Sequence, residues 1–491
     1  MSPLTQILSI DQGTTNSKAV LVADDGTVIA RGTAPVSLTL PRPGWVEQDA
    51  EEIWASVLQA VGRCLAAGGR AADVRAVALS NQRESVLAWR RSDGAPLGPV
   101  IGWQDRRTTE WCTSISTPAN ATLVQQSTGL PIDAMFSAPK IRWLLELAKQ
   151  AGTPLADVCV GTVDSWLIWK LTAAAEHLTE AGNASRTLLY DVRRLGWDDT
   201  LLDLFDVPRS VLPEVRASNA GFGRVSGVPG LPDGLPVIAV LADSHAALYG
   251  QGCTTVGSAK ATYGTGSSVM TPTQSLQLGQ SAVPSTLAWV TDRPTYAVEG
   301  NILSSGAALA WMANILGLGD VAALGPLAEQ VHHSGGVTFV PAFSGLGAPH
   351  WDRSAVAQLT GMSQATLPAH LARAALEAVA HQVCDVVAAM ERSGDLHIDV
   401  LRADGGATRS ELLMQIQADL LGRPVAVSDL AEVSAIGAAL LAWHTLGVGT
   451  ADRSEELGHR FTPALDADAR DRARQSWARA VAGSRGCPDS R

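Results

Sequence analysis

Cysteine is scarce in this sequence and never occurs in close pairs. The six cysteines, at positions 64, 112, 159, 253, 384 and 487, lie far apart and include no Cys-x-x-Cys spacing. This distribution indicates neither a cysteine zinc site nor a disulfide framework. We therefore expect reduced cysteines in the hydrophobic core of a cytoplasmic protein.

Positive charge and long apolar runs are also lacking. The 37 Lys and Arg residues are outnumbered by 48 Asp and Glu residues, which gives a net charge of −11. Proteins that bind nucleic acid do so through a surplus of Lys and Arg, so this balance argues against nucleic acid as a partner. No stretch approaches the ~18 apolar residues of a membrane-spanning helix. The N-terminus has no basic region, and Asp11 interrupts its apolar run early, so we expect no membrane partner either.

Two common phosphate-binding motifs are absent. The chain contains no Gly-Lys dipeptide, which excludes a Walker A loop, and no G-x-G-x-x-G follows the first expected strand. The stretch DQGTTNSKAVLVADDG, residues 11–26, offers another solution because β-like segments flank its polar part and predict a hairpin. At the tip, Gly13 permits close approach, Thr14 and Thr15 are donors, and Lys18 is cationic, which together suit a phosphate. An ordinary surface turn is the alternative interpretation.

The 491 residues exceed what one core supports, and about 150 residues per domain predicts two to four domains. The first part of the chain alternates short β-like runs with a helix expected over residues 49–69, a pattern typical of α/β proteins. A second helix is expected after residue 136, with Ser137 as a candidate N-cap and Pro139 in the first turn. A strand over residues 236–242 should end at Asp243 and give way to a helix, where α/β proteins often place chemistry.

The pattern restarts near residue 250. The segment GSAKATYGTGSSVM, residues 257–270, again predicts a strand, a tight Gly/Thr tip at residues 264–266, and a second strand. A long Ala-rich helix is expected from about Pro368 to Met390. The Asp-Gly-Gly at residues 404–406 lies at a strand-to-helix junction, which would point backbone amides at a ligand. Three such tips in two halves predict a nucleotide bound between two lobes.

Many ordered blocks resemble the FGGY carbohydrate kinases, and within that family the glycerol kinases. They include DQGTTNSKAV, PGWVEQDAEEIW, SNQRES, GTVDSWLIWKLT, NASRT, ADSHAALYGQ, FSGLGAPHWD and DGGATRSELLMQIQADLLG, and they cover about residues 5 to 445. The resemblance implies an α/β fold of two actin-like (ribonuclease-H-like) ATPase lobes with a cleft between them. It implies ATP and Mg²⁺ as cofactors, and transfer of a phosphoryl group to a terminal hydroxyl of a small polyol or sugar.

The resemblance also implies a domain division. An N-terminal domain, residues 1–250, would bind the substrate and part of the phosphate chain. A C-terminal domain, residues 251–450, would bind the nucleotide, and residues 451–491 would form a peripheral segment. The sequence leaves open whether the chain forms a homodimer or a homotetramer.

Residue by residue, the resemblance assigns roles at matching positions. Asp243 matches the catalytic base, and Asp11 matches a carboxylate linked to Mg²⁺ through water, with Asp243 also near the metal. Arg83, Glu84 and Trp103 match the substrate contacts: the charged pair can straddle neighbouring hydroxyls, and the indole offers an apolar face to the carbon chain. The nucleotide contacts that the resemblance implies are Thr14, Thr15, Asn16, Lys18, Gly264, Thr265, Gly266, Gly306, Gly406, Ala407 and Ser410.

Several positions depart from the glycerol kinase pattern. Met135 replaces a Tyr, Ser244 replaces a Gln, and Ser268 replaces a Phe of the pocket, while Lys18 replaces an Arg and Ser410-Glu411 an Asn pair. The three pocket changes leave space and hydroxyl partners, so we predict an acceptor of four or five carbons, a polyol or ketopentose. Glycerol kinase proper is the alternative, and a non-catalytic, nucleotide-dependent regulator is a rival from another class.

Overall fold

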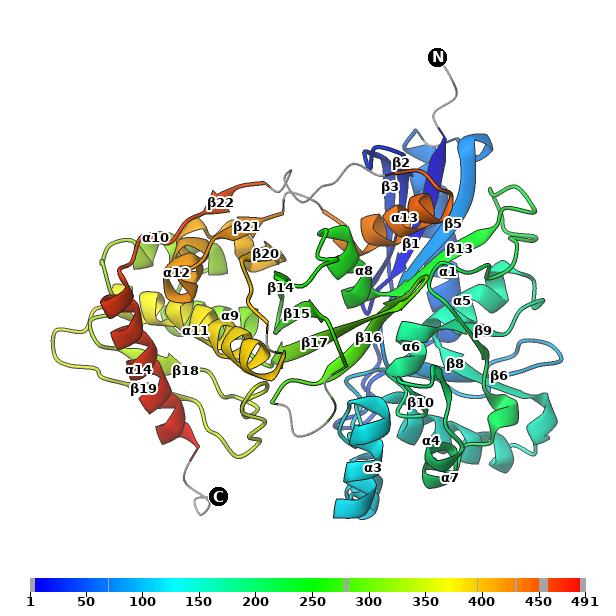
Figure 1. The fold of residues 1–491 in the computed structure, drawn as a ribbon, viewed down its shortest axis with the longest axis horizontal. Helices are drawn as coiled ribbons and strands as arrows, with labels where there is room; N and C mark the ends of the chain where they lie inside the picture. Colours follow the sequence, from blue (N-terminus) through cyan, green and yellow to red (C-terminus); the bar gives the residue numbers. More distant parts are fainter. Residues whose placement is uncertain are drawn as a thin grey trace. The chain divides into compact units, whose positions relative to one another are not determined.

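The computed structural model divides into two compact units, each described by itself below (Figure 1). It describes residues 5–68, 70–276, 278, 282–394, 396–428, 431–449 and 458–485. The first unit comprises Met1–Gly252, Ser285–Tyr296 and Ala431–Asp452, and the second comprises Cys253–Pro284, Ala297–Leu430 and Arg453–Arg491. The units therefore do not follow sequence order. The expected division into domains at residues 250 and 450 remains a prediction.

The first unit contains a mixed sheet with strand order β13-β5-β1-β2-β3. Its strands are β1 (Gln6–Gln12), β2 (Asn16–Ala23), β3 (Val28–Pro35), β5 (Val74–Asn81) and β13 (Val237–Ala242). Strands β1 and β2 pair antiparallel, with Asp11 opposite Lys18, so the predicted hairpin is confirmed. Because β1, β5 and β13 are parallel, their carboxyl ends lie at one edge of the sheet, where chemistry-bearing side chains can meet.

Helices cover this sheet. Helix α1 (Ala50–Ala66) packs against β2 and β3, as its apolar spacing predicted, and Asp49 caps it by accepting from the Glu52 amide. Helix α13 (Val433–Thr445) packs against β1, β5 and α8 (Asp243–Gly250). A Cβ placed on Gly437 would lie 1.9 Å from the Ala246 carbonyl oxygen, so only glycine permits this close approach of α13 to α8.

A second sheet of the first unit has the order β4-β7-β6-β8.

The helix predicted after residue 136 is present as α4, but Ser137 is not its N-cap. Phe136 precedes the helix, and the Ser137 hydroxyl instead donates to the Glu84 carbonyl oxygen at 3.0 Å. The remaining elements of this unit are β4 (Glu47–Gln48), β6 (Val86–Arg90), β7 (Val100–Ile101), β8 (Val158–Thr162), β9 (Leu178–Glu180), β10 (Tyr190–Asp191), β11 (Gly196–Trp197), β12 (Glu214–Arg216), β16 (Ser285–Val290), α2 (Thr109–Ile115), α3 (Pro118–Thr128), α4 (Ser137–Gln150), α5 (Val163–Leu171), α6 (Ala181–Ser185), α7 (Asp199–Phe205) and the 3₁₀ helices η1 (Ala71–Asp73), η2 (Leu155–Asp157) and η3 (Arg209–Val211).

The second unit is built on strands in the order β17-β15-β14-β20-β21-β22. The predicted hairpin over residues 257–270 is confirmed as β14 and β15, and the expected Ala-rich helix is α11. Strand β20 runs parallel to β14. The elements of this unit are β14 (Ser258–Tyr263), β15 (Ser267–Thr273), β17 (Pro294–Ile302), β18 (Thr338–Val340), β19 (Gln358–Thr360), β20 (Val400–Asp404), β21 (Val425–Val427), β22 (Arg460–Phe461), α9 (Gly306–Ile315), α10 (Leu324–Ala328), α11 (Pro368–Gly394), α12 (Glu411–Leu421), α14 (Ala467–Ser484) and the 3₁₀ helices η4 (Val321–Ala323) and η5 (Gly406–Arg409).

Helix α14 lies in the segment 451–491, for which a peripheral position remains a prediction, and contributes side chains to the core of the second unit. Trp477 on this helix is 1% exposed and belongs to the hydrophobic core of the second unit. Its indole nitrogen donates to Asp385 Oδ2 of α11 at 2.7 Å. Residues 451–457 and 486–491 of the segment lie outside the described residues.

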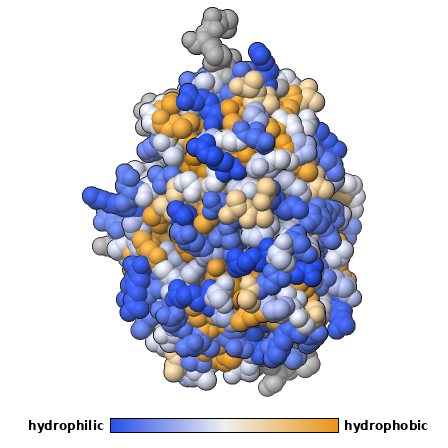
Figure 2. Space-filling view, turned by 90° about the vertical axis from the view of Figure 1, so that its right-hand side faces the viewer, coloured by the Kyte–Doolittle hydropathy of each residue, from blue (hydrophilic) through white to orange (hydrophobic). Residues whose placement is uncertain are grey.

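The five cysteines within the described ranges are buried and unpaired, as expected for core residues, and Cys487 lies outside those ranges. Among the helices that the structure describes, none has the length and apolar character needed to cross a membrane. On the face shown in Figure 2, hydrophilic residues predominate and hydrophobic ones are scattered between them.

Candidate active site

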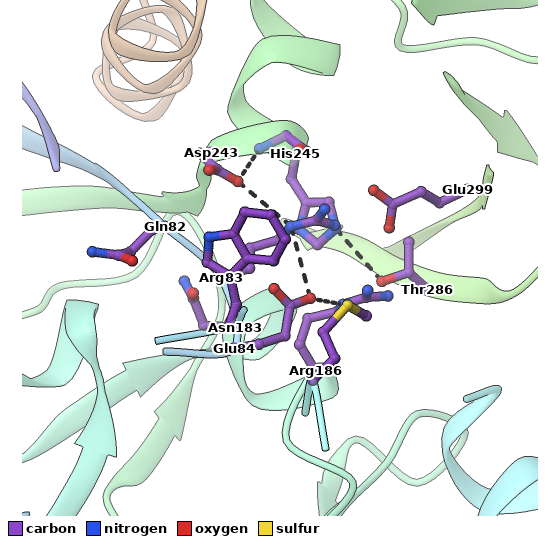
Figure 3. A network of polar contacts seen from close by, with 12 residues as sticks. Gln82, Arg83, Glu84, Asn183, Arg186, Asp243, His245, Thr286 and Glu299 are labelled. Carbon is purple, nitrogen blue, oxygen red and sulfur yellow. Dashed lines mark hydrogen bonds and ion pairs between the residues drawn. The ribbon is translucent and has the colours of Figure 1, made fainter. Parts of the chain in front are cut away.

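The ends of parallel strands in the first unit bring a carboxylate and a charged pair together. Arg83 and Glu84 follow β5, and Asp243 is the first residue of α8, directly after β13. Arg83 Nε lies 3.5 Å from Asp243 Oδ1 and 3.9 Å from Glu84 Oε1 (Figure 3). Glu84 has φ +61°, a left-handed conformation that is rare outside glycine and concentrated at functional sites.

Asp243 combines partial exposure with an altered proton affinity. Its side chain is 37% exposed, and the Ser244 amide donates to Oδ1 at 2.6 Å. Desolvation by the surrounding protein raises the pKa of Asp243 from 3.8 to about 6; the Arg83 charge opposes this shift, while Asp11 and Glu84 add to it. Such a carboxylate is ionised at neutral pH yet more basic than an ordinary aspartate, which suits a general base.

Arg186, which the sequence reasoning did not single out, holds Glu84. Its Nε donates to Glu84 Oε1 at 2.6 Å, and the two side chains are 2% and 6% exposed. Its guanidinium lies 5.3 Å from the centre of the Phe136 ring. Arg186 lies within the block NASRT, but nothing in that block indicated which carboxylate it would meet. The pair fixes Glu84 in place, as Figure 3 shows.

The predicted phosphate tip is a tight turn between β1 and β2. The Gly13 amide donates to the Asn16 carbonyl oxygen at 2.9 Å and closes the turn. Thr15 is exposed, Thr14 is half-buried, and the Asn16 side chain donates to the Thr15 hydroxyl at 3.1 Å. The Thr14 hydroxyl accepts from Trp103 Nε1, also at 3.1 Å, so the tip contacts a predicted substrate residue.

Asp11 and Lys18 are paired in register at the base of this tip. Burial raises the pKa of Asp11, and the Lys18 charge opposes the shift. Asp11 Oδ1 is buried and accepts no hydrogen bond of standard geometry from the residues that the structure describes, although the Ser80 side chain opposes the rise in the pKa of Asp11. A buried carboxylate oxygen without a partner fits a residue whose normal partner is a metal-bound water.

In the second unit, the predicted nucleotide residues cluster at one end of β14 and β20. The Gly306 amide at the start of α9 donates to the Gly264 carbonyl oxygen at 2.9 Å, and a Cβ on Gly306 would lie 2.6 Å from that oxygen. Gly405, with φ +100°, approaches the Tyr263 backbone equally closely. These contacts join the tip at residues 264–266 to the turn that carries Gly406 and Ala407, while Ser410 caps α12.

The predicted pocket residues are divided between the units. Trp103, Met135 and Ser244 belong to the first unit, whereas Ser268 belongs to the second, where its hydroxyl donates to Glu299 Oε1 at 3.1 Å. Trp103 is 37% exposed, so its indole is open to a ligand.

A buried lysine that the sequence reasoning missed supports these pocket residues. Lys140 Nζ donates to the Gly102 and Met135 carbonyl oxygens at 3.2 and 2.7 Å. Burial lowers the pKa of Lys140 from 10.5 to about 7. Its position in the helical pattern of α4 gave no signal of this contact.

Comparison with known proteins identifies the class. The chain matches the N-terminal domain of the FGGY family of carbohydrate kinases over residues 6–250 and the C-terminal domain over residues 259–446. These matches, together with the α/β fold, define a phosphotransferase. The chain belongs to the FGGY family of carbohydrate kinases and is an ATP-dependent kinase of that family.

Individual proteins that are similar to this chain are also kinases. An apulose kinase of Pectobacterium atrosepticum is 44% identical, with 99% of both chains covered, and a glycerol kinase of Citrifermentans bemidjiense is 43% identical, with 97% of this chain and 98% of that protein covered. The crystal structure of Plasmodium falciparum glycerol kinase with ADP matches with a TM-score of 0.90 at 31% identity, covering 98% of each chain. The expected family and the actin-like fold of the lobes are confirmed, and the non-catalytic alternative is set aside.

Proposed function

We propose that this kinase phosphorylates a terminal hydroxyl of a polyol or ketopentose with four or five carbons, with Asp243 as general base. The observation that carries the proposal is the contact of Asp243 with Arg83, which lies beside Glu84. Arg83 and Glu84 can hold neighbouring hydroxyls of the acceptor, while Asp243 takes the proton of the hydroxyl that attacks. Glycerol kinase proper is the alternative.

The cofactors of the proposed reaction are ATP and Mg²⁺. Bound with ATP, Mg²⁺ would supply positive charge against the negative charge that develops on the transferred phosphoryl group. Asp11 and Asp243 are the residues proposed to hold it, Asp11 through water. Thr14, Thr15, Asn16 and Lys18 would bind the phosphates from the first unit. The proposed nucleotide contacts of the second unit are Gly264, Thr265, Gly266, Gly306, Gly406, Ala407 and Ser410.

Two of the predicted pocket residues support the larger acceptor. Met135 is flexible and Ser244 is short, where glycerol kinases carry a tyrosine and a glutamine. The identity to an apulose kinase is 44% and that to a glycerol kinase is 43%, so the comparisons favour neither substrate. Ser268, whose hydroxyl already has Glu299 as a partner, contributes less to this argument than its position in the sequence indicated.

Glycerol should be a poor acceptor. Each lost contact of about methylene size is worth roughly 1–3 kcal/mol, so kcat/KM for glycerol should be roughly 10- to 200-fold below that for the best larger acceptor. ADP release measured over glycerol, tetritols, pentitols, ketopentoses and apulose tests this. Met135→Tyr is the matched variant and should shift the ratio back toward glycerol. A clear preference of the unaltered enzyme for glycerol would restore the plain glycerol kinase reading.

Activity should fall on acidification through the pKa of Asp243. Because this pKa is raised to about 6, the carboxylate becomes protonated as the pH drops below that value and can no longer accept a proton. Below pH 6, kcat/KM should decline about tenfold per pH unit. The residual activity of Asp243→Asn should not show this decline of kcat/KM below pH 6. A limb near the ordinary aspartate value of 3.8 would contradict the assignment.

A further inference from the structure

A closed circuit of hydrogen bonds in the first unit joins the phosphate tip to the indole of Trp103. Three buried glutamines and one serine form it, and none of them was predicted as a site residue. Gln12, Gln48 and Gln82 are 0%, 2% and 1% exposed, and Ser85 is 0% exposed. They come from β1, β4 and the segment that follows β5.

Two of the glutamines hold consecutive carbonyl groups of the tip. Gln12 Nε2 donates to the Gly13 carbonyl oxygen at 2.7 Å, and Gln48 Nε2 donates to the Thr14 carbonyl oxygen at 2.8 Å. These bonds set the direction of the backbone that carries the Thr14 hydroxyl. They leave the exposed side of the tip to other partners.

Gln82 connects these two amides with each other and with the substrate side. Its Nε2 donates to Gln12 Oε1 at 3.0 Å and to Gln48 Oε1 at 2.9 Å, while its Oε1 accepts from the Ser85 hydroxyl at 2.8 Å. Both amide hydrogens and the carbonyl oxygen are therefore used. Gln82 directly precedes Arg83, and its side chain is labelled in Figure 3.

Trp103 closes the circuit. Its backbone amide donates to Ser85 Oγ at 3.1 Å, and its indole Nε1 donates to Thr14 Oγ1 at 3.1 Å. A buried polar network of this kind is costly when incomplete and specifies one geometry when fully satisfied. Here it specifies the distance between the proposed phosphate contact and the proposed substrate wall.

We propose that Gln82 is a positioning residue that holds Thr14 and Trp103 in register, so that the acceptor hydroxyl meets the phosphoryl group in a reactive geometry. The inference rests on the proposed roles of Thr14 and Trp103. Gln82 itself contacts neither ligand. Its contribution is orientation, which is worth large factors in rate when reacting groups must be aligned.

Gln82→Met tests the inference, because methionine keeps the approximate size and removes all three hydrogen bonds. Misplacement of reacting groups by about 1 Å costs on the order of 10²-fold, so kcat for acceptor phosphorylation should fall by about that factor. ATP affinity, measured by titration without acceptor, and the slow transfer of phosphoryl to water should change far less. Ser85→Ala interrupts the circuit with a smaller change and should lower the same rate in the same direction.

Two controls separate positioning from general damage. Gln6→Met replaces a buried glutamine, 4% exposed, at the opposite end of β1 and should leave the ratio of acceptor phosphorylation to ATP hydrolysis unchanged. Trp103→Phe keeps an aromatic wall but removes the indole donor. If the hydrogen bonds of the circuit act together, adding Gln82→Met to Trp103→Phe should lower kcat for acceptor phosphorylation much less than Gln82→Met lowers it in the unaltered enzyme.

The outcomes are distinct. The positioning role would be overturned if the losses in kcat of Gln82→Met and Trp103→Phe were additive in the double variant. It would also be overturned if neither Gln82→Met nor Ser85→Ala changed the ratio of acceptor phosphorylation to ATP hydrolysis. Either result would leave the proposed function intact. Thr14→Val and Trp103→Ala, assayed in parallel, test the site itself. If neither alters any kinetic constant, the proposed contacts fail, and the inference fails with them.

Discussion

Replacing Asp243 by asparagine should lower turnover by roughly 10²–10⁴-fold, the range for removing a positioned general base. Asparagine keeps the shape of the side chain and an oxygen that can accept from the Ser244 amide. It cannot take a proton from the acceptor hydroxyl. Steady-state ADP release should therefore collapse, while binding of ATP changes little.

A surface aspartate supplies the control for this experiment. Asp199, whose side chain is 82% exposed, pairs with Arg209 away from the candidate site, and Asp199→Asn should leave turnover unchanged. Near-normal turnover of Asp243→Asn would remove Asp243 from the role of base. Equal loss in both variants would indicate a fault of the preparations.

Arg186→Met should destabilise the protein by at most roughly 3–5 kcal/mol, the cost of breaking a buried ion pair, because Arg83 Nε still lies 3.9 Å from Glu84 Oε1 and compensates it in part. Glu84 is 6% exposed and would lose the guanidinium that now donates to it at 2.6 Å. Urea unfolding should show the loss in the free energy of unfolding. The KM of the acceptor should rise as well, because Glu84 is a proposed substrate contact.

The exposed pair Arg209–Asp199 is again the matched comparison. Arg209 is 51% exposed, and surface ion pairs contribute at most about 1 kcal/mol, so Arg209→Met should cost far less than Arg186→Met. Similar losses in the two variants would contradict the structural account of Glu84. The account would also be contradicted if Arg186→Met had normal stability and an unchanged KM for the acceptor.

Much of the local structure could be predicted because its causes are local. The hairpin over residues 11–26 follows from two β-like runs around a polar turn, and α1 follows from apolar residues at helical spacing after Asp49. The position of Asp243 follows from a buried strand that ends at a carboxylate. The motifs that surround these residues were sufficient to recognise the family.

Long-range partners could not be predicted in the same way. Arg186 and Glu84 are 102 positions apart, and nothing near either residue selects the other. Ser137 is of a residue type that is common at N-caps, yet its hydroxyl donates to the Glu84 carbonyl oxygen, which the fold brings close to it. Residues 285–296 and 431–449 join the first unit, and Trp477 enters the core of the second, because their buried surfaces fit there and not because of their order in the chain.

The sequence by itself identified the family through the motifs that resemble it. Side-chain periodicity and turn chemistry, which act over a few residues, determined the strand-end positions of Asp11, Arg83 and Asp243 and the glycine-containing tips. Only the tertiary structure decided which charges meet in the interior. Burial makes the Glu84–Arg186 pair obligatory and raises the pKa of Asp243. The same packing brings Gln12, Gln48 and Gln82 together from three separate segments into one hydrogen-bonded circuit, because buried amides must find partners wherever the fold places them.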